Sequence, residues 1–182
     1  MFKLSIANPI LREIVDWAIV IGLALVLAFV ARTFLFRVTR VSGDSMLPSF
    51  NNGDVLILNR LAYRIGSPAV GDIVAFPYPQ DPSSFFIKRI IAGPGDVVDL
   101  QGYQFWVNGA PLDDAFSHEP VTAFASVTFP LTVEEGRFFV LGDNRNHSRD
   151  SRYLGVGNIY GSDLLGRASI RVWPFNALGR VN

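Results

Sequence analysis

The stretch Phe85-Phe86-Ile87-Lys88-Arg89-Ile90-Ile91 is a short apolar run that carries two basic residues, and Gly93-Pro94-Gly95-Asp96 ends it. Short apolar runs bounded by glycine, proline, asparagine and aspartate are typical of β-strands. Six further runs of this kind follow residue 37: Val55–Leu58, Asp72–Phe76, Val97–Leu100, Gln104–Val107, Arg137–Leu141 and Ala168–Trp173. No helical period of useful length occurs there, and Leu61–Arg64 would make one short turn. The pattern predicts a mainly β domain over residues 37–182.

The middle of this domain is expected to contain a hairpin and a small excursion. Gln104–Leu112 has the pattern of a hairpin that turns at Asn108-Gly109, because a type I′ turn needs positive φ at both central residues. The region 110–135 has weaker apolar patterning. We therefore expect it to form a small cap on the main sheet.

Composition excludes several classes of site. The 182 residues suit one domain and a short appendage. The formal net charge is zero and basic residues are scattered, so charge gives no indication of a nucleic-acid partner. The absence of cysteine excludes disulfides, thiolate metal sites and a cysteine nucleophile. Two histidines are too few for most histidine-rich metal sites, so no metal or other cofactor is expected.

An apolar segment, residues 14–36, precedes the strands. Its uncharged part, Trp17–Ala31, is shorter than the roughly 20 residues that span a bilayer, so a span requires Asp16 and Arg32 near the two interfaces. A cleaved signal peptide is one alternative, but Arg32–Arg37 is a poor cleavage site. A buried helix of a soluble domain is another. We expect a retained transmembrane anchor.

The charges that flank this segment bear on its orientation. Lys3 and Arg12 precede it, and Arg32, Arg37 and Arg40 follow it. The positive-inside rule alone mildly favours a cytoplasmic C-terminal domain.

Lys88 is a candidate general base. Phe86 and Ile90 would share its face of a strand, so its neighbours are apolar. A lysine accepts a proton only when neutral, and at the reference pKa of ~10.4 the neutral fraction at pH 7 is below roughly 0.1%. Burial lowers the pKa of a lysine because it disfavours the ammonium. The alternative is a lysine that protects a sheet edge from aggregation.

Ser45 is a candidate nucleophile. It stands between Gly43, which permits unusual backbone angles, and Pro48, which fixes the direction of the chain. Such a turn can expose a hydroxyl and aim N–H groups at an oxyanion, although an ordinary surface turn has the same composition. The hydroxyl needs a base. Lys88 is the candidate, and His147 is a rival in a sequence setting typical of surface residues.

A third polar segment, Gly142–Arg152, supplies hydrogen-bonding groups. Ser148 could exchange a hydrogen bond with the lysine amine. Asp150 and Arg152 would share one face of a strand and could pair. The alternative is a solvated loop of mixed charge.

Together these segments resemble the type I signal peptidases, also called leader peptidases. The pattern Ser-Met-x-Pro-(Ser/Thr) is matched by Ser45–Ser49, and the long polar pattern that begins Gly-Asp-Asn-Arg is matched throughout by Gly142–Gly155. The lysine pattern is matched by Lys88–Asp96, except that Ala92 stands where a glycine is usual. Lysine as base, one anchor and a short cap indicate the compact bacterial form rather than the histidine-dependent type.

The resemblance implies a role for each matched residue. Ser45 would be the nucleophile and Lys88 the base, oriented by Ser148. Supporting residues would be Asp143, Arg89, Asp150, Arg152 and Gly142. Candidate walls of the substrate pockets are Met46, Phe50, Phe86 and Ile87. The family's oxyanion hole uses the N–H of the nucleophile. Some members add a serine hydroxyl at the position of Gly43, where a backbone N–H or a water would have to replace it.

The resemblance also implies the fold, the reaction and the location. The fold would be an antiparallel β-sheet catalytic domain with a small cap, and the reaction would be removal of signal peptides from translocated preproteins. The protein would be single-pass in the cell membrane, with a short cytoplasmic tail (1–13), an anchor (14–36) and an extracytoplasmic domain (37–182). Its partners would be secretory preproteins, the lipid bilayer and the secretion translocon, and not nucleic acid.

Two rival functions differ in testable ways. One rival is a related Ser/Lys protease, such as a self-cleaving repressor or a pilus-processing peptidase. A repressor should lack the anchor and carry a DNA-binding domain, and neither feature fits this sequence. A catalytically dead, membrane-anchored binding domain would not cleave a preprotein, and the presence of Ser45, Lys88 and Ser148 together speaks against it.

Overall fold

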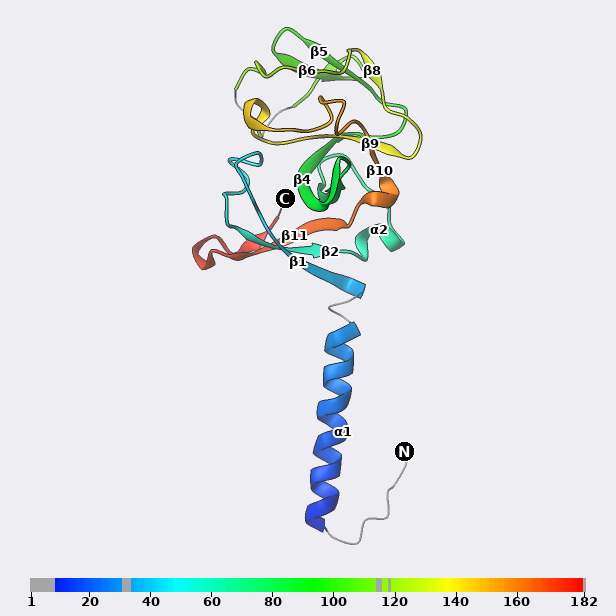
Figure 1. Cartoon of the computed structure of the whole chain (residues 1–182), viewed down its shortest axis with the longest axis vertical. Coiled ribbons are helices and arrows are strands. Elements are labelled where there is room, and N and C mark those ends of the chain that lie inside the picture. The colour runs from blue at the N-terminus through cyan, green and yellow to red at the C-terminus, as the bar shows by residue number, and fades with distance from the viewer. Residues whose placement is uncertain (1–8, 31–33, 114–115, 118, 182) are drawn as a thin grey trace. The chain divides into compact units, whose positions relative to one another are not determined.

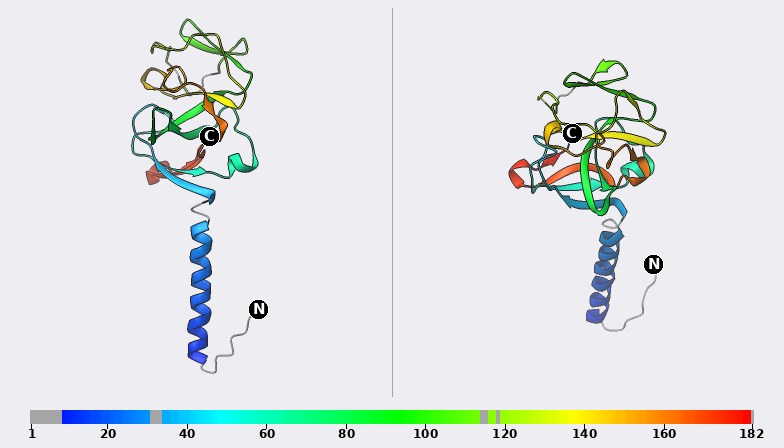
Figure 2. Two further views of the ribbon diagram at one scale, coloured as in Figure 1. Left: turned by 45° about the vertical axis from the view of Figure 1, so that its right-hand side comes forward. Right: turned by 45° about the horizontal axis from the view of Figure 1, so that its top comes forward.

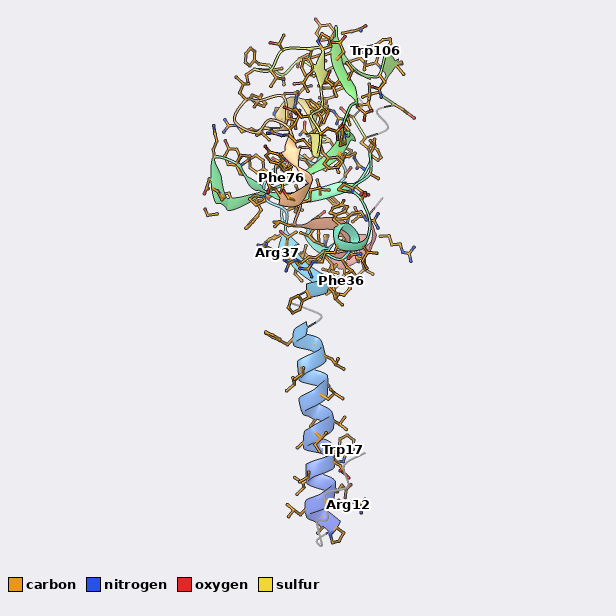
Figure 3. The ribbon with its side chains drawn as sticks, turned by 90° about the vertical axis from the view of Figure 1, so that its right-hand side faces the viewer. Arg12, Trp17, Phe36, Arg37, Phe76 and Trp106 are labelled. Atoms are coloured by element: carbon orange, nitrogen blue, oxygen red, sulfur yellow. The ribbon has the colours of Figure 1, made fainter. Side chains whose placement is uncertain are left out.

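The computed structural model describes residues 9–30, 34–113, 116–117 and 119–181. The chain divides into two compact units, Met1–Phe36 and Arg37–Asn182. The first unit contains helix α1 (Pro9–Val30), whose proline stands at the start of the helix, where its missing N–H has no partner to lose. Large apolar side chains of α1 are exposed, among them Trp17, which is 61% exposed and labelled in Figure 3.

The predicted anchor is not confirmed by the structure. Among the helices in the described ranges, none combines the length and the apolar character needed to cross a membrane. Residues 31–33 of the predicted segment lie outside the described residues, and Phe36, its last residue, begins strand β1.

The second unit is built on an eight-stranded sheet, and every pairing that the structure gives is antiparallel. The strand order is β1-β2-β11-β3-β4-β9-β10, with β12 paired to β11. The strands are β1 (Phe36–Arg40), β2 (Val55–Asn59), β3 (Ile73–Tyr78), β4 (Asp81–Ala92), β9 (Arg137–Leu141), β10 (Ile159–Tyr160), β11 (Gly166–Trp173) and β12 (Gly179–Arg180). The predicted mainly antiparallel β fold is confirmed.

A second sheet of four strands forms the cap, and β5, β6 and β8 lie together at one end of the domain in Figure 1. Its order is β7-β6-β5-β8, with β5 (Val97–Gln101), β6 (Gln104–Val107), β7 (Ala110–Pro111) and β8 (Leu131–Thr132). The β6–β7 hairpin turns at Asn108 (φ 53°) and Gly109 (φ 78°), as predicted. The small sheet begins at β5, before the region 110–135 in which the sequence predicted the cap. Strong strand patterns in β5 and β6 do not reveal which sheet they join.

Short helices complete the described part of the second unit. They are α2 (Ala62–Ile65), where one turn was predicted, and three 3₁₀ turns: η2 (Arg145–His147), η3 (Gly161–Asp163) and η4 (Phe175–Ala177). The segment of η4 and β12 follows β11, and this orange-to-red hairpin projects from the side of the domain in both views of Figure 2.

Strand β4 connects three apolar clusters and thereby fixes the position of its lysine. Ile87 belongs to the cluster that contains Met46 and Leu56, and Ile90 to the cluster that contains Phe76. Ile91 and Ala92 belong to the cluster beneath the small sheet. Full burial of such a side chain contributes about 1.5–3 kcal/mol, so β4 is held firmly on both faces. Figure 3 labels Phe76 within the domain and Trp106 on the small sheet.

Candidate active site

Ser45 lies in a loop that connects β1 to β2, here called the nucleophile loop (residues 41–54). Hydrogen bonds from Val41 N to Asp54 O (2.8 Å) and from Gly53 N to Val41 O (2.9 Å) close the loop at its base. Gly43 has a φ of +85°, which an L side chain rarely adopts, so a glycine is required at this bend. The loop is therefore a defined turn that presents one serine.

Lys88 lies on β4 directly beside this serine. Its Nζ is 2.8 Å from Ser45 Oγ and 3.0 Å from the carbonyl oxygen of Ile87. The residue is only 3% exposed, and Nζ lies 5.0 Å from the centre of the Phe86 ring. Strand alternation places Phe86 and Lys88 on one face, as the sequence predicted.

Burial lowers the pKa of the Lys88 amine from its ordinary value of 10.5 to about 8. The carboxylates of Asp150 and Asp143 act in the opposite direction, and the Arg152 guanidinium lowers the pKa further. A lysine with this pKa is partly neutral near physiological pH. As an ammonium it donates to Ser45 Oγ, and as a neutral amine it can accept the proton of the hydroxyl.

Two buried ion pairs surround the dyad of Ser45 and Lys88. Arg152 donates through Nε to Asp150 Oδ1 (2.7 Å) and through Nη2 to Asp150 Oδ2 (2.8 Å). Both side chains are fully buried. The predicted pair therefore exists, but in a turn rather than on a strand. Asp150 Oδ2 also accepts the N–H of Gly142 (3.1 Å), which fixes the segment against β9.

The second pair joins β4 to the third segment. Arg89 donates through Nε to Asp143 Oδ1 (2.9 Å) and through Nη2 to Oδ2 (2.8 Å). Ser49 Oγ donates to the same carboxylate at 2.6 Å, so this pair also holds the end of the nucleophile loop. Breaking a buried pair of this kind costs about 3–5 kcal/mol, because the remaining charge loses its partner.

Ser148 is buried next to the site, but the expected hydrogen bond with Lys88 does not occur among the described residues. Its side chain is 7% exposed, and its Oγ has no hydrogen-bond partner in the described residues. The amine of Lys88 uses the carbonyl of Ile87 instead. A Cβ at Gly142 would lie 2.2 Å from Ser148 Oγ and 2.4 Å from Ser45 O. Gly142 therefore allows the third segment to approach the nucleophile loop.

Asn144 and Ser49 make hydrogen bonds at the site that were not predicted from the sequence. Asn144 donates from its backbone N–H to Ser45 O (3.1 Å) and from Nδ2 to Asp44 O (3.0 Å). It therefore fixes the backbone on both sides of the Asp44–Ser45 bond. Both residues stand inside the quoted motifs, which is the only signal that could have identified them.

A cavity of about 410 Å³ opens beside Ser45 and Lys88. Three of the four residues expected in the walls of a substrate pocket line this cavity: Met46, Phe86 and Ile87. Phe50 does not line it: this side chain is 3% exposed and packs in the core cluster with Met46.

The hydrogen bonding of three further groups bears on the chemistry of the site: the His147 side chain and the backbone N–H groups of Gly43 and Ser45. The exposed side chain of His147 lines the cavity, and Ser45 Oγ has its hydrogen bond with Lys88 rather than with this histidine. Gly43 N donates to Asn52 Oδ1 (3.2 Å). The N–H of Ser45 donates to no acceptor within the described part of the chain, so it is available to a substrate oxyanion. Within the described ranges, no group of three or more histidine, aspartate or glutamate side chains is arranged so that it could hold a metal ion.

Comparisons with known proteins bear on the family of this chain. The family model described as signal peptidase, peptidase S26, matches residues 14–173. Signal peptidase I S of Bacillus subtilis (strain 168) is 32% identical over 179 residues, which cover 94% of this chain and 95% of the relative. Signal peptidase I of Leptolyngbya laminosa is 37% identical over 169 residues, which cover 88% and 80%. A crystal structure of a signal peptidase I from Enterococcus faecalis V583 is 33% identical, with a TM-score of 0.49, and covers 57% of this chain and 98% of that chain. The family model and both relatives span most of the chain, which therefore belongs to the signal peptidase family, peptidase S26, and is a hydrolase.

Proposed function

We propose that this protein is a serine endopeptidase that removes N-terminal signal peptides from translocated preproteins with a Ser45/Lys88 dyad. The observation that carries the proposal is the 2.8 Å distance between Lys88 Nζ and Ser45 Oγ, made by a lysine that is 3% exposed. A nucleophile needs a base within hydrogen-bond reach, and here the base is also desolvated. The names of the relatives support signal peptides as the substrate.

The acylation step follows from this geometry. The neutral amine of Lys88 takes the proton of Ser45 as Oγ attacks the carbonyl carbon of the scissile bond. The resulting oxyanion accepts a hydrogen bond from the backbone N–H of Ser45. A preorganised donor of this kind contributes strongly to acyl transfer. When the intermediate collapses, the ammonium of Lys88 returns the proton to the leaving amine. The signal peptide then remains as an ester on Ser45.

Deacylation uses the same base a second time. Neutral Lys88 takes a proton from a water molecule as that water attacks the ester carbonyl. Collapse of the second intermediate expels Ser45 Oγ, which regains the proton from Lys88. The released products are the signal peptide with a free carboxylate and the mature protein with a free amine.

Membrane attachment is part of the proposal. The exposed apolar side chains of α1 and the resemblance to type I signal peptidases support an anchor near residues 14–36 and an extracytoplasmic catalytic domain. In that location the enzyme would meet preproteins at the bilayer and near the translocon. Protease added to intact spheroplasts should then digest residues 37–182. Digestion only after lysis would contradict this orientation.

Cleavage of a reporter preprotein tests the function directly. The full chain in detergent should convert the reporter to a product whose new N-terminus, measured by mass spectrometry, lies at the signal-peptide junction. Ser45→Ala should lose this activity and keep its far-UV circular dichroism. A wild-type protein that does not cleave, or a Ser45→Ala variant that still cleaves, would disprove the proposal.

A further inference from the structure

Arg171 contacts the nucleophile loop from outside the three motif segments. It lies on β11, which pairs with β2, the strand that follows the loop. Its Nη1 donates to Ser49 O at 3.2 Å and to Asp54 Oδ2 at 3.0 Å. Its Nε donates to Ala177 O at 2.8 Å, which fixes the guanidinium from the other side. One side chain thus holds two points of the loop that carries Ser45.

Asp54 is the residue at which the loop closes. Its carbonyl accepts the N–H of Val41 (2.8 Å), and its Oδ2 accepts the N–H of Asn51 (3.1 Å). The side chain of Asp54 is only 4% exposed, whereas that of Arg171 is 25% exposed. A nearly buried carboxylate requires a partner, and Arg171 supplies it.

Ser49 is held on both of its sides. Its hydroxyl donates to Asp143 and its carbonyl accepts from Arg171. Ser49 stands four positions after Ser45, within the same tight turn, so a displacement of Ser49 would move the nucleophile. Displacement of a reacting group by about 1 Å can cost roughly a hundredfold in rate.

We propose that Arg171 is a positioning residue that keeps the nucleophile loop in register with Lys88. This inference rests on the proposed function, because it concerns the same serine. Arg171 touches neither Lys88 nor the cavity beside Ser45, and it acts through Ser49 and Asp54. Loss of its guanidinium loosens the loop and lengthens the path between Ser45 Oγ and Lys88 Nζ.

The same strand offers a matched control. Arg167 on β11 also pairs with an aspartate, through Nη1 to Asp72 Oδ1 at 3.3 Å, but Asp72 does not belong to the nucleophile loop. Arg171→Met should lower kcat roughly tenfold to a hundredfold while KM changes less than about twofold. Arg167→Met should leave both constants unchanged. Arg171→Lys should recover part of kcat, because an ammonium can reach one of the two acceptors.

A second readout is independent of activity. Amide hydrogen exchange of the full chain should accelerate in residues 41–54 of Arg171→Met, where the N–H groups of Val41, Phe50 and Gly53 are hydrogen-bonded within the loop. Peptides from β9 should exchange as in the wild type. If Arg171→Met does not fold, Arg171→Lys and Asp54→Asn replace it in both measurements.

The outcomes distinguish the positioning role of Arg171 from the proposed function. A wild type that fails to cleave would disprove the proposed function. Faster amide exchange in the nucleophile loop of Arg171→Met would still support the positioning role of Arg171. An unchanged kcat in folded Arg171→Met, a loss confined to KM, or loop exchange equal to that of Arg167→Met would overturn the assignment of Arg171.

Discussion

Replacement of Lys88 by methionine is expected to abolish cleavage and, at neutral pH, to stabilise the folded protein. Methionine has a similar length and no charge, so it fits a position that is 3% exposed. The variant has no group that can accept the proton of Ser45. The stability gain comes from removing an ammonium that the folded state disfavours.

The magnitude follows from the two pKa values. Burial lowers the pKa of Lys88 from 10.5 to about 8, and one pKa unit corresponds to about 1.4 kcal/mol. Below pH 8 the lysine is protonated in both states, so the folded protein carries a free-energy penalty of about 3.5 kcal/mol. Between pH 8 and pH 10.5 only the unfolded chain keeps the proton, and the penalty shrinks as the pH rises. At pH 10 about 1 kcal/mol remains.

The assay is chemical denaturation of the full chain in detergent at pH 7, 8, 9 and 10. The free energy of unfolding of Lys88→Met minus that of the wild type should fall by about 2.5 kcal/mol over this range. Lost hydrogen bonds and altered packing do not titrate, so they cancel in the pH dependence. Ser45→Ala is the control, because it is inactive but retains the lysine, and its difference from the wild type should not change with pH.

The lowered pKa of Lys88 also predicts how the cleavage rate depends on pH. The neutral fraction of Lys88 rises about tenfold between pH 7 and pH 9, and kcat of the wild type should rise with it. A stability difference that is constant or grows with pH would refute the buried, titrating lysine. A rate that falls over this range, with the protein still folded, would show that a protonated group is required instead.

Three further substitutions test the neighbourhood of the dyad. Gly142→Ala should inactivate the enzyme and destabilise the fold by several kcal/mol, on the order of an overpacked core, because its Cβ would meet Ser148 Oγ at 2.2 Å and Ser45 O at 2.4 Å. Gly93→Ala is its control, since its nearest contact is an ordinary 3.7 Å, and thermal unfolding with a cleavage assay compares the two. His147→Ala should keep kcat within about twofold of the wild type, and an inactive variant would contradict Lys88 as the base. Ser148→Ala should not lower the free energy of unfolding, because its buried hydroxyl has no partner in the described residues, and a loss of more than about 1 kcal/mol in a denaturant titration would reveal one.

The strands that the sequence predicted are those with an apolar run of about four or five residues. β2, β3, β5, β6, β9 and β11 all coincide with such runs. β10 and β12 contain two residues each and have no periodicity to detect. The start of β4 was also missed, since Asp81–Ser84 is polar and exposed. The sequence could not predict which sheet each strand joins, because this depends on contacts between segments that are distant in the chain.

The site was predictable in its residue types but not in its connections. Burial of Lys88 follows from its apolar neighbours, whereas Asp150 pairs with Arg152 in a turn and not on the strand face that their spacing suggested. The contacts that fix the loop join residues far apart in the chain: Ser49 to Asp143 over 94 positions, Asn144 to Asp44 over 100, and Arg171 to Asp54 over 117. No local pattern encodes such a contact, which explains why these partners were not assigned.

The buried ion pairs explain how the lysine keeps its low pKa in a polar site. Asp150 and Asp143 lie near enough to raise the pKa of Lys88, and an unpaired carboxylate there would favour the ammonium and remove the base. Each of these carboxylates is instead matched by a bidentate guanidinium, Arg152 for Asp150 and Arg89 for Asp143. The pairs thus supply rigid hydrogen bonds to Gly142 and Ser49 with nearly cancelled charge. A site that needs both a fixed backbone and a neutral lysine is therefore expected to bury its acids with arginines, because desolvation then remains the largest influence on the amine.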